Sequence, residues 1–486
     1  MGARAALNSR HMAKRQPAPA PRAAPLSVVI LAAGQGKRMK SSLPKVLQPL
    51  AGRPLLKHVI DTARTLEPAA IHVVYGHGGD LVRETLKDEP GGPMGQPVSW
   101  VLQAERLGTG HAVMQAMPNV PNDHIVLVLY GDVPLISRAT LAQLLTLAGS
   151  QQTGLLTMEL DDPTGYGRII RGKRDRVQKI VEQKDASKKE LKIRECNTGV
   201  LAAPARLLKK WLKGVRNENS QGEYYLTDVI ELAAKDKVAV TPLLTADVIE
   251  VLGVNDKTQL AELESALRRR VTRDLMLAGV TIIDPARVDV RGTVVHGSDV
   301  TIDVNVVLEG KVKLGDRVRI GPNCLIRNSE IGDDTEVFPS CVVDGAVIGK
   351  SCNIGPFARF RPTSTLANEV HIGNFVEVKN STMGDGSKAN HLAYVGDAKV
   401  GNRVNIGAGT IIANYDGANK HKTIIEDDVH TGSNSVLVAP ITVGPGATIA
   451  AGSTVAKEVP PGKLTVARAR QTTIENWQRP TKQPKT

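Results

Sequence analysis

The stretch TIDVNVVLEGKVKLGDRVRIGPNCLIR, residues 301–327, decides the fold of the C-terminal half of this chain. Its aliphatic residues fall six apart, at Ile302, Leu308, Leu314, Ile320 and Ile326. An α-helix needs a spacing of 3.6 and a half-buried strand a spacing of two, so neither element explains the pattern. Six-residue steps punctuated by glycine indicate a parallel β-helix, in which each hexapeptide forms one short flat side and a turn.

The same period recurs in two later runs, which makes chance alignment a poor explanation. The runs are Ile354, Phe360, Leu366, Ile372 and Val378, and then Leu437, Val443, Ile449 and Val455, with glycine at 315, 321, 355, 373 and 444. Such a prism stacks an aliphatic column inside and leaves flat faces outside, and flat faces associate. We therefore expect a homo-oligomer, specifically a homotrimer with sites between prisms.

The N-terminal half has a different pattern, in which short apolar runs alternate with longer segments. The runs are SVVILAAG (27–34), IHVVYG (71–76), HIVLVLYGD (124–132) and GLLTMEL (154–160). Continuous apolar runs that end in Gly or Asp are typical of strands buried on both faces of a mostly parallel sheet, and the intervening segments are long enough for crossover helices. The fold class is thus a Rossmann-like α/β nucleotide-binding domain followed by a β-helix, which the resemblance below implies is left-handed.

Between these halves, leucines and valines recur at three- and four-residue steps over 256–278, which predicts one helix. The expected organisation is a disordered lead-in (1–26) that begins like an expression-vector remnant, an α/β nucleotide-binding domain (27–255), a helical linker arm (256–279), a β-helix domain (280–468) and a basic tail (469–486).

Charge and composition narrow the function classes. Of the net charge of +13, ten excess charges lie near the two termini, which indicates solvated basic tails rather than a nucleic-acid-binding face. No run approaches the ~18 apolar residues of a membrane helix, and the first 25 residues lack the apolar core of a signal peptide. The four cysteines show no CxxC spacing. We expect a cytosolic protein without integral membrane segments, zinc site or disulfides.

The first apolar run leads directly into LAAGQGKRMKSSLPKVL, residues 31–47. Gly34 and Gly36 allow backbone N–H groups to face an anion, while Lys37, Arg38 and Lys45 bring positive charge to the carboxyl end of a strand. A triphosphate would fit this mouth, although an ordinary glycine-rich turn with surface lysines is the alternative. The spacing is not that of a P-loop, because no GK[ST] follows.

Asp132 stands where an apolar strand leaves its sheet. Packing explains such a carboxylate poorly, whereas a hard cation that bridges phosphate oxygens requires one. We interpret Asp132 as a metal ligand, with a helix N-cap as the alternative.

His391 is the candidate base of a second site on the β-helix. The repeat is interpreted as interrupted over 379–397 and again over 405–423, and interruptions of a repeat project as loops that carry function. Acetylation of an amine requires a base that removes its proton, and an imidazole, which titrates near neutral pH, is the usual base for this step. Most of eleven histidines are surface or packing residues, but an unusual set of polar residues accompanies this one: Arg361, Lys379, Tyr394, Asn405, Asn414 and Tyr415.

Two sets of motifs carry a family resemblance over residues 27–478. The first set is LAAGQGKRM with LPKVL, LQAERLGTGHA (102–112), YGDVPL (130–135), GYGRI (165–169), IVEQKDA (180–186), ECNTG (195–199) and GVND (253–256). The second set is FARFRP (357–362), VEVKN (376–380), HLAYVGD (391–397), NIGAGT (405–410) and NYDGANKHKT (414–423). Together they resemble the bifunctional N-acetylglucosamine-1-phosphate uridylyltransferases/glucosamine-1-phosphate N-acetyltransferases. Ile412 and Ala413 depart from the more polar residues of some members.

The resemblance implies two reactions: acetyl transfer from acetyl-CoA to glucosamine-1-phosphate, and then uridylyl transfer from UTP to N-acetylglucosamine-1-phosphate with release of pyrophosphate. The product, UDP-N-acetylglucosamine, would supply peptidoglycan and lipopolysaccharide synthesis.

For the uridylyl site the resemblance assigns nucleotide binding to Leu31, Ala32, Ala33, Gly34, Lys45, Gln103, Gly108, Thr109 and Tyr130. It makes Arg38 and Lys45 catalytic charge-balancing residues. Asp132 and Asn255 would hold Mg²⁺, and Gly167, Glu182, Asn197 and Asn255 would contact the sugar phosphate.

For the acetyl site it makes His391 the catalytic base and gives the sugar phosphate to Arg361, Lys379, Tyr394 and Asn405. Acetyl-CoA would contact Ala408, Asn414, Tyr415, Ser433, Ala451 and Arg468, with Asn414 and backbone amides stabilising the oxyanion.

Two alternatives remain at this point. One is a different sugar-nucleotide pyrophosphorylase whose β-helix is structural or regulatory, so that no base is needed on the prism. The other is a non-catalytic interaction protein built from the same two domain types. That protein would have lost its phosphate and metal positions, whereas Arg38, Lys45, Asp132 and Asn255 are all present.

Overall fold

A computed structural model describes residues 24–34, 36–76, 79–86 and 98–482. The predicted lead-in lies largely outside these residues, as do Gln35 of the glycine-rich turn and the side chain of Lys37. The described chain divides into two compact units, residues 1–48 with 54–257 and residues 49–53 with 258–486. Each unit is described by itself below.

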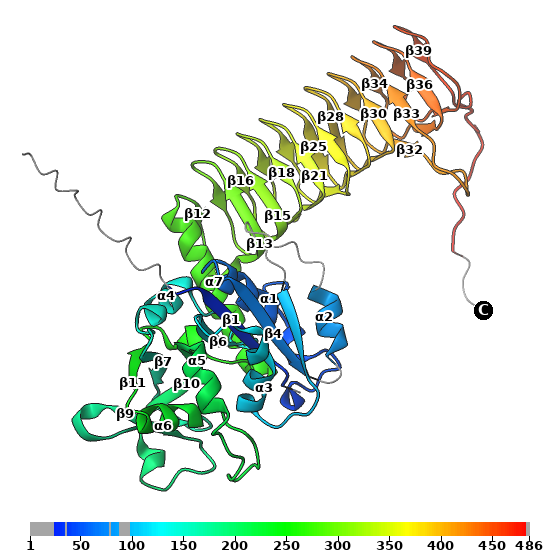
Figure 1. The fold of residues 1–486 in the computed structure, drawn as a ribbon. Helices are drawn as coiled ribbons and strands as arrows, with labels where there is room; N and C mark the ends of the chain where they lie inside the picture. The colour runs from blue at the N-terminus through cyan, green and yellow to red at the C-terminus, as the bar shows by residue number, and fades with distance from the viewer. Residues whose placement is uncertain (1–23, 35, 77–78, 87–97, 483–486) are drawn as a thin grey trace, which may run out of the picture. The chain divides into compact units, whose positions relative to one another are not determined.

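The first unit is built on one mixed sheet with the strand order β11-β7-β10-β6-β1-β4-β5, and β8 and β9 attached beside β10 (Figure 1). Its main strands are β1 (Leu26–Ala32), β4 (Ala70–Gly76), β5 (Val98–Gln103), β6 (Ile125–Tyr130), β7 (Gln152–Glu159), β8 (Arg168–Arg171), β9 (Val177–Val181), β10 (Glu195–Pro204) and β11 (Ala239–Leu244). Its helices are α1 (Leu55–Arg64), α2 (Asp80–Leu86), α3 (Thr109–Ala116), α4 (Arg138–Thr146), α5 (Ala205–Leu212) and α6 (Asp228–Lys235).

The predicted strands are confirmed, and the part of the sheet formed by β6-β1-β4-β5 is parallel as predicted. β1 pairs in parallel with β4 and β6, whereas β10 is antiparallel to both β6 and β7. The inner strands are buried on both faces, because separate apolar cores lie on the two sides of the sheet. Since β1 and β6 run in the same direction, their carboxyl ends open at one edge of the sheet, where ligands of such folds bind.

The second unit is a parallel β-helix, as its six-residue period predicts (Figure 1). Its strands form an eleven-stranded sheet and a seventeen-stranded sheet within the described residues. The former has β12 (Thr281–Ile282), β14 (Thr301–Ile302), β16 (Arg319–Ile320), β19 (Glu336–Val337), β22 (Asn353–Ile354), β25 (His371–Asn374), β28 (Lys388–His391), β31 (Asn405–Ile406), β34 (His430–Thr431), β37 (Thr448–Ile449) and β39 (Leu464–Thr465). The latter has β13 (Asp289–His296), β15 (Val307–Leu314), β17 (Leu325–Arg327), β18 (Glu330–Ile331), β20 (Val342–Asp344), β21 (Ala346–Ile348), β23 (Arg359–Phe360), β24 (Ser364–Leu366), β26 (Glu377–Lys379), β27 (Thr382–Met383), β29 (Tyr394–Gly396), β30 (Ala398–Val400), β32 (Ile411–Ala413), β33 (Thr423–Ile425), β35 (Val436–Val438), β36 (Ile441–Val443) and β38 (Thr454–Val455).

The aliphatic residues of all three predicted runs are buried inside this prism, each with 3% exposure or less. The four cysteines of the chain are free and buried, as expected, and three of them lie in the same core. The predicted helix is α7, Lys257–Leu277. It belongs to the β-helix unit rather than standing apart as an arm, because Leu275 joins the prism core and Val271 packs against it.

The expected break in the repeat over 379–397 is wrong. β26, β29 and β32 remain in register through Glu377, Tyr394 and Ile411, one 17-residue coil apart. The core residues Val378, Met383 and Ala389 show why the period is hidden: one step is five residues long, and a small alanine replaces a larger aliphatic. The one long coil in this region lies later, where Ile411 pairs with Val436. Its extra residues form the loop around 414–422.

Candidate active sites

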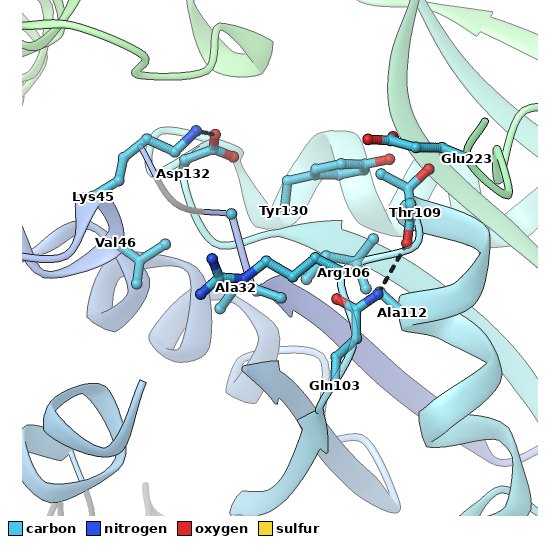
Figure 2. Close-up of a pocket in the computed structure, with 14 residues that line it drawn as sticks. Ala32, Lys45, Val46, Gln103, Arg106, Thr109, Ala112, Tyr130, Asp132 and Glu223 are labelled. Atoms are coloured by element: carbon cyan, nitrogen blue, oxygen red, sulfur yellow. Dashed lines mark hydrogen bonds and ion pairs between the residues drawn. The ribbon is translucent and has the colours of Figure 1, made fainter. Parts of the chain in front are cut away.

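A cavity of about 560 Å³ lies at the carboxyl ends of β1 and β6 (Figure 2). Leu31 and Tyr130 are partners in the parallel register, and the carbonyl of Leu31 accepts a hydrogen bond from the N–H of Gly131 at 2.9 Å. The chain thus leaves both strands side by side. The cavity is lined by Leu31, Ala32, Ala33, Gly34, Lys45, Val46, Gln103, Arg106, Gly108, Thr109, Ala112, Tyr130, Asp132 and Glu223.

At one end of this cavity, the ammonium of Lys45 contacts two oxygen ligands. Its Nζ pairs with the carboxylate of Asp132 and lies 3.3 Å from the side-chain oxygen of Asn255 (Figure 2 shows the first pair). The side chains of Lys45 and Asp132 are only 12% and 18% exposed. The GVND segment reaches this point because the N–H of Val254 donates to the carbonyl of Asp132 at 2.9 Å.

This arrangement gathers oxygen ligands that suit a hard cation, but only a carboxylate and an amide. Among the described residues, no group of three or more His, Cys, Asp or Glu side chains could hold a metal ion. A divalent ion here would therefore need oxygens from a ligand such as a phosphate to complete its coordination.

The other end of the cavity is formed by Gln103 and the turn before α3. Gln103 is buried, and its Nε2 donates to the carbonyl of Gly108 at 3.1 Å (Figure 2). Gly108 has φ +108°, and a Cβ there would stand 2.6 Å from the carbonyl oxygen of Tyr224. Only glycine suits this close approach, which sets the start of α3 and the position of Thr109.

Tyr130 connects the cavity to the predicted sugar residues. Its ring packs so tightly against Gly199 on β10 that a Cβ at 199 would overlap it. Burial raises the pKa of Tyr130, and the carboxylates of Glu182 and Asp132 raise it further. The phenol therefore stays protonated at neutral pH and remains a hydrogen-bond donor.

Of the four residues assigned from the sequence to the sugar phosphate, Gly167, Glu182 and Asn197 lie together, whereas Asn255 lies beside Lys45. The N–H of Asn197 donates to the carbonyl of Gly167 at 2.9 Å, and a Cβ on Gly167 would be 3.4 Å from the carboxylate oxygens of Glu182. Burial raises the pKa of Glu182, although a hydrogen bond of 3.1 Å from the hydroxyl of Thr227 opposes this.

A buried arginine holds the turn that presents Gly167. Arg168 is 1% exposed, and its guanidinium donates to the side-chain oxygen of Gln183 at 2.8 Å. The same oxygen accepts the N–H of Gly165 at 3.2 Å. Gln183 therefore ties the GYGR turn to the segment after β9 that carries Glu182.

The sequence reasoning missed four cavity residues: Val46, Arg106, Ala112 and Glu223. Arg106 was within reach, because it belongs to the LQAERLGTG motif and is charged. Its guanidinium lies against Gly76, where a Cβ would stand 2.9 Å from Nε. Glu223 has no such signal. Arg38, conversely, is exposed on the 3-10 turn Lys37–Met39 and is not among the lining residues.

On the β-helix, His391 ends β28 and is exposed. A column of residues in successive coils runs from His391 through Ala408 and Ser433 to Ala451. The backbone carbonyl of each of the first three accepts a hydrogen bond from the N–H group that follows the next residue of the column. Gly409 donates to His391 at 3.2 Å, Asn434 to Ala408 at 2.7 Å and Gly452 to Ser433 at 2.8 Å. The guanidinium of Arg468 closes the column by donating to the carbonyl of Ala451 at 3.0 Å.

Lys379, Tyr394 and Asn414 form a separate cluster on the seventeen-stranded sheet. The side-chain nitrogen of Asn414 lies 3.5 Å from the Tyr394 hydroxyl, and Nζ of Lys379 lies 3.2 Å from Asp397. Tyr415 is exposed on the neighbouring loop, and its hydroxyl donates to the carbonyl of Gly417.

Two predicted residues of this site are not in that cluster. Arg361 pairs with Glu377 at 3.3 Å on the outer surface. Asn405 lies on β31 of the eleven-stranded sheet, where its backbone pairs with Lys388 and His430.

The fold and these two sites define a nucleotidyltransferase joined in one chain to a left-handed β-helix acyltransferase of hexapeptide repeats. The chain matches the MobA-like NTP transferase domain over residues 28–191, the GMPPB C-terminal domain over 290–375 and the bacterial transferase hexapeptide (six repeats) over 422–457.

Relatives match almost the whole chain. It is 57% identical to the bifunctional protein GlmU of Azoarcus sp. (strain BH72), over 94% of this chain and 100% of that protein. It is 56% identical to the bifunctional protein GlmU of Ralstonia nicotianae, over 95% and 100% of the two chains. The chain belongs to the GlmU family.

The chain is therefore an enzyme with two transferase activities. It acetylates glucosamine-1-phosphate and transfers a uridylyl group to the acetylated sugar phosphate, which yields UDP-N-acetylglucosamine. No helix among the described residues is long and apolar enough to span a membrane.

Proposed function

We propose that the uridylyl transfer takes place in the cavity at the β1–β6 edge and the acetyl transfer on the β-helix around His391. One observation carries the first assignment: ten residues that the sequence motifs assign to nucleotide or metal line this single cavity. They come from segments as far apart as residues 31 and 132, so sequence proximity does not explain their meeting. We also propose that the enzyme is cytoplasmic, because its substrates UTP and acetyl-CoA are cytoplasmic metabolites.

In the proposed uridylyl transfer, an oxygen of the sugar 1-phosphate attacks the α-phosphorus of UTP in line, and pyrophosphate leaves. No nucleophilic side chain is required, so the protein positions the two phosphates and neutralises charge. Lys45 is suited to this because its ammonium already lies inside the cavity, 12% exposed. Arg38, exposed near the same turn, would approach the phosphates from the outside.

The residues present fit a magnesium ion. Asp132 and Asn255 offer oxygen ligands on the same side of the cavity, and both contact one ammonium, a cation, in this structure. When bound, Mg²⁺ would neutralise charge on the phosphate oxygens. Lys45, released from Asp132 and Asn255, would then pair with the phosphates.

For the acceptor sugar, we assign Gly167, Glu182 and Asn197. A half-buried carboxylate such as Glu182 accepts hydrogen bonds from sugar hydroxyls. A Cβ at 167 would stand 3.0 Å from the side chain of Ile180 and 3.4 Å from the carboxylate of Glu182, so a side chain there would be crowded, which supports a backbone contact with the sugar at that point.

For acetyl transfer, we assign His391 as the base that removes a proton from the amino group of glucosamine-1-phosphate. The amine then attacks the thioester carbonyl, and the CoA thiolate leaves with a proton. Lys379 and Arg361 would hold the sugar phosphate. The column through Ala408, Ser433 and Ala451 consists of small residues, which supports a groove that admits an extended pantetheine arm up to Arg468.

We further propose that the enzyme is a homotrimer whose acetyl sites are shared between copies. Phe357, Phe375 and Leu392 form an apolar ridge along one corner of the prism, exposed by 49%, 58% and 61%. The two phenyl rings stack with centroids 5.1 Å apart. All three have positive φ, a conformation that costs a non-glycine residue free energy. A second copy that covers this ridge would lie beside His391, and its Asn405 could complete the site.

The test is an assay of both reactions on the full-length enzyme with Asp132→Ala and with His391→Ala. With glucosamine-1-phosphate, acetyl-CoA, UTP and Mg²⁺, we expect Asp132→Ala to abolish formation of UDP-sugar but not release of CoA thiol. We expect the reverse for His391→Ala when N-acetylglucosamine-1-phosphate is supplied.

Mixing the two variants provides the control. Because each variant retains one intact site, the mixture should convert glucosamine-1-phosphate to UDP-N-acetylglucosamine after a lag. Thiol release that persists in His391→Ala would show that the β-helix base lies elsewhere. Loss of both reactions in either variant would show that the substitution had disturbed folding.

A further inference from the structure

One buried carboxylate that the motifs leave without a role stands at the centre of the acetyl-transfer cluster. Asp397 is 7% exposed at the corner between β29 and β30. It accepts hydrogen bonds from the Nζ of Lys379 at 3.2 Å, from the Nδ2 of Asn380 at 2.6 Å and from the Nδ2 of Asn414. Two of these three donors are residues assigned above to the substrates.

The donors keep this carboxylate charged. Burial raises the pKa of Asp397, but the hydrogen bonds from Asn380, Lys379 and Asn414 outweigh burial and leave its pKa below the ordinary value. The pKa of Lys379 is raised, because its bond to Asp397 outweighs the lowering by burial. The two charges therefore coexist at neutral pH, and Lys379 keeps further N–H donors for a ligand.

The contact with Asp397 also determines how Asn414 is oriented. Its amide nitrogen faces the carboxylate and lies 3.5 Å from the hydroxyl of Tyr394. Its side-chain oxygen is then the group left for a ligand, and an amide oxygen accepts hydrogen bonds but cannot donate them. Asn414 is thus suited to accept from the substrate amine, and the oxyanion is left to backbone N–H groups.

Tyr394 is held over the same corner. A Cβ at Gly396, two residues along β29, would overlap the Tyr394 hydroxyl, so only glycine leaves room for it. The hydroxyl therefore lies between its own strand and the loop that carries Asn414. Lys379 and Gly396 are register partners in adjacent coils, which brings Lys379 to the same place.

We propose that Asp397 is a positioning residue for acetyl transfer: its buried carboxylate holds Lys379 toward the sugar phosphate and turns Asn414 so that its oxygen meets the amine. The proposal rests on the assignment of Lys379 and Asn414 to the substrate, made above. Asp397 itself touches no reacting atom.

The test compares Asp397→Asn with wild type in the acetyl-transfer reaction. The asparagine side chain has nearly the same shape as aspartate but no negative charge, and an NH2 group, which donates hydrogen bonds, replaces one of the two carboxylate oxygens. We expect the KM for glucosamine-1-phosphate to rise about 10- to 100-fold, the range that a hydrogen bond to a charged group supplies, with a fall in kcat. The KM for acetyl-CoA should change much less, and uridylyl transfer by the same molecules should be unchanged.

Asp428→Asn is the control, because Asp428 also pairs with a cation in the neighbouring coil, Arg403 at 2.7 Å, but that pair is exposed and lies away from the cluster. It should leave both KM values at the wild-type level. A purely structural role for Asp397 would lower the thermal midpoint and the active fraction without moving the KM. That result, or an unchanged KM in a folded variant, would overturn the proposal.

Lys379→Met separates this proposal from the site assignment. If Lys379→Met leaves the KM for glucosamine-1-phosphate unchanged, the assignment itself is wrong. If Lys379→Met raises the KM and Asp397→Asn does not, only the role of Asp397 is wrong. The double variant removes both charges together, so it serves even if Asp397→Asn folds poorly. We expect the fold-increase in its KM for glucosamine-1-phosphate to be smaller than the product of the fold-increases in the two single variants. A fold-increase equal to that product would mean that the two residues act independently, which would contradict the proposal.

Discussion

At the scale of single residues, Tyr130 connects the two halves of the proposed uridylyl site. It lines the cavity at the β1–β6 edge, and its ring packs on Gly199, in the irregular part of β10 that follows Asn197. Gly199 has φ +86°, so both its conformation and the space above it require glycine.

We expect Gly199→Ala to displace the ring of Tyr130 and to lower kcat/KM for uridylyl transfer about 100-fold, the typical effect of a misplacement of 1 Å at an active site. Steady-state kinetics would measure this, with acetyl transfer unchanged. Gly222→Ala separates displacement from backbone strain, because Gly222 also has a positive φ, +68°, but no atom within 4 Å of its added Cβ. If kcat/KM for uridylyl transfer falls equally in both variants, backbone strain rather than displacement of Tyr130 is the cause.

Asp228 is a residue whose charge should weaken the fold. Burial, followed by the neighbouring carboxylates of Glu231 and Glu182, raises its pKa from 3.8 to about 6. A raised carboxyl pKa means that the folded state binds the proton more tightly than the unfolded chain. The associated stability is therefore present below the unfolded pKa and is lost as the pH rises through about 6.

Asp228→Asn removes this dependence. We expect its thermal midpoint to exceed that of wild type at about pH 7 and the difference to shrink toward about pH 4, because there the wild-type carboxyl is also neutral. Thermal unfolding across this pH range checks the prediction. A difference that does not vary with pH would indicate an effect on the start of α6 rather than on charge.

At the scale of elements, the coils of the β-helix depend on one internal column. Phe360 on β23 pairs with Val343 below and Val378 above, and all three are buried. Each coil contacts only its neighbours, so a cavity in one coil cannot be filled from elsewhere.

We expect Phe360→Ala to lower the free energy of unfolding of the β-helix by about 3–5 kcal/mol. Denaturant unfolding measures this. Thr365→Ala is the control, because Thr365 lies on the exposed face of the next strand, β24, and its loss should change the free energy by less than about 0.5 kcal/mol. Similar losses for both variants would mean that packing in the column is not what stabilises the coil.

At the scale of the whole molecule, the proposed trimer depends on the apolar ridge. We expect Phe375→Glu to place a charge in the contact between copies and to shift the enzyme from trimer to monomer, as light scattering would show. Acetyl transfer should be lost and uridylyl transfer retained, because the cavity of the first unit is complete within one chain. Val347→Glu, at a residue 49% exposed on another strand, is the control. If the Phe375→Glu variant remains a trimer, the ridge is not the contact that holds the copies together.

Sequence alone predicted both architectures, the four N-terminal strands and the helix α7, and the family resemblance named ten residues that line one cavity. The architectures and elements follow from local periodicity, which a linear chain displays directly, whereas the ten residues come from motifs shared with the family. The break predicted at 379–397 is absent, because a five-residue step and the small Ala389 hide an intact coil in the sequence.

Only the tertiary structure revealed the rest. Glu223 joins the cavity because the chain beside Tyr224 folds back onto the start of α3, where the carbonyl of Tyr224 accepts the N–H of Gly110 at 2.7 Å. Asp397 meets Lys379 and Asn414 because these residues stand 18 and 17 positions from it, so that successive coils bring all three to one corner. The place of Glu223 depends on how distant segments pack, which no spacing along the chain encodes, and the corner around Asp397 is recognised only once the coil register over 379–397 is known to be intact.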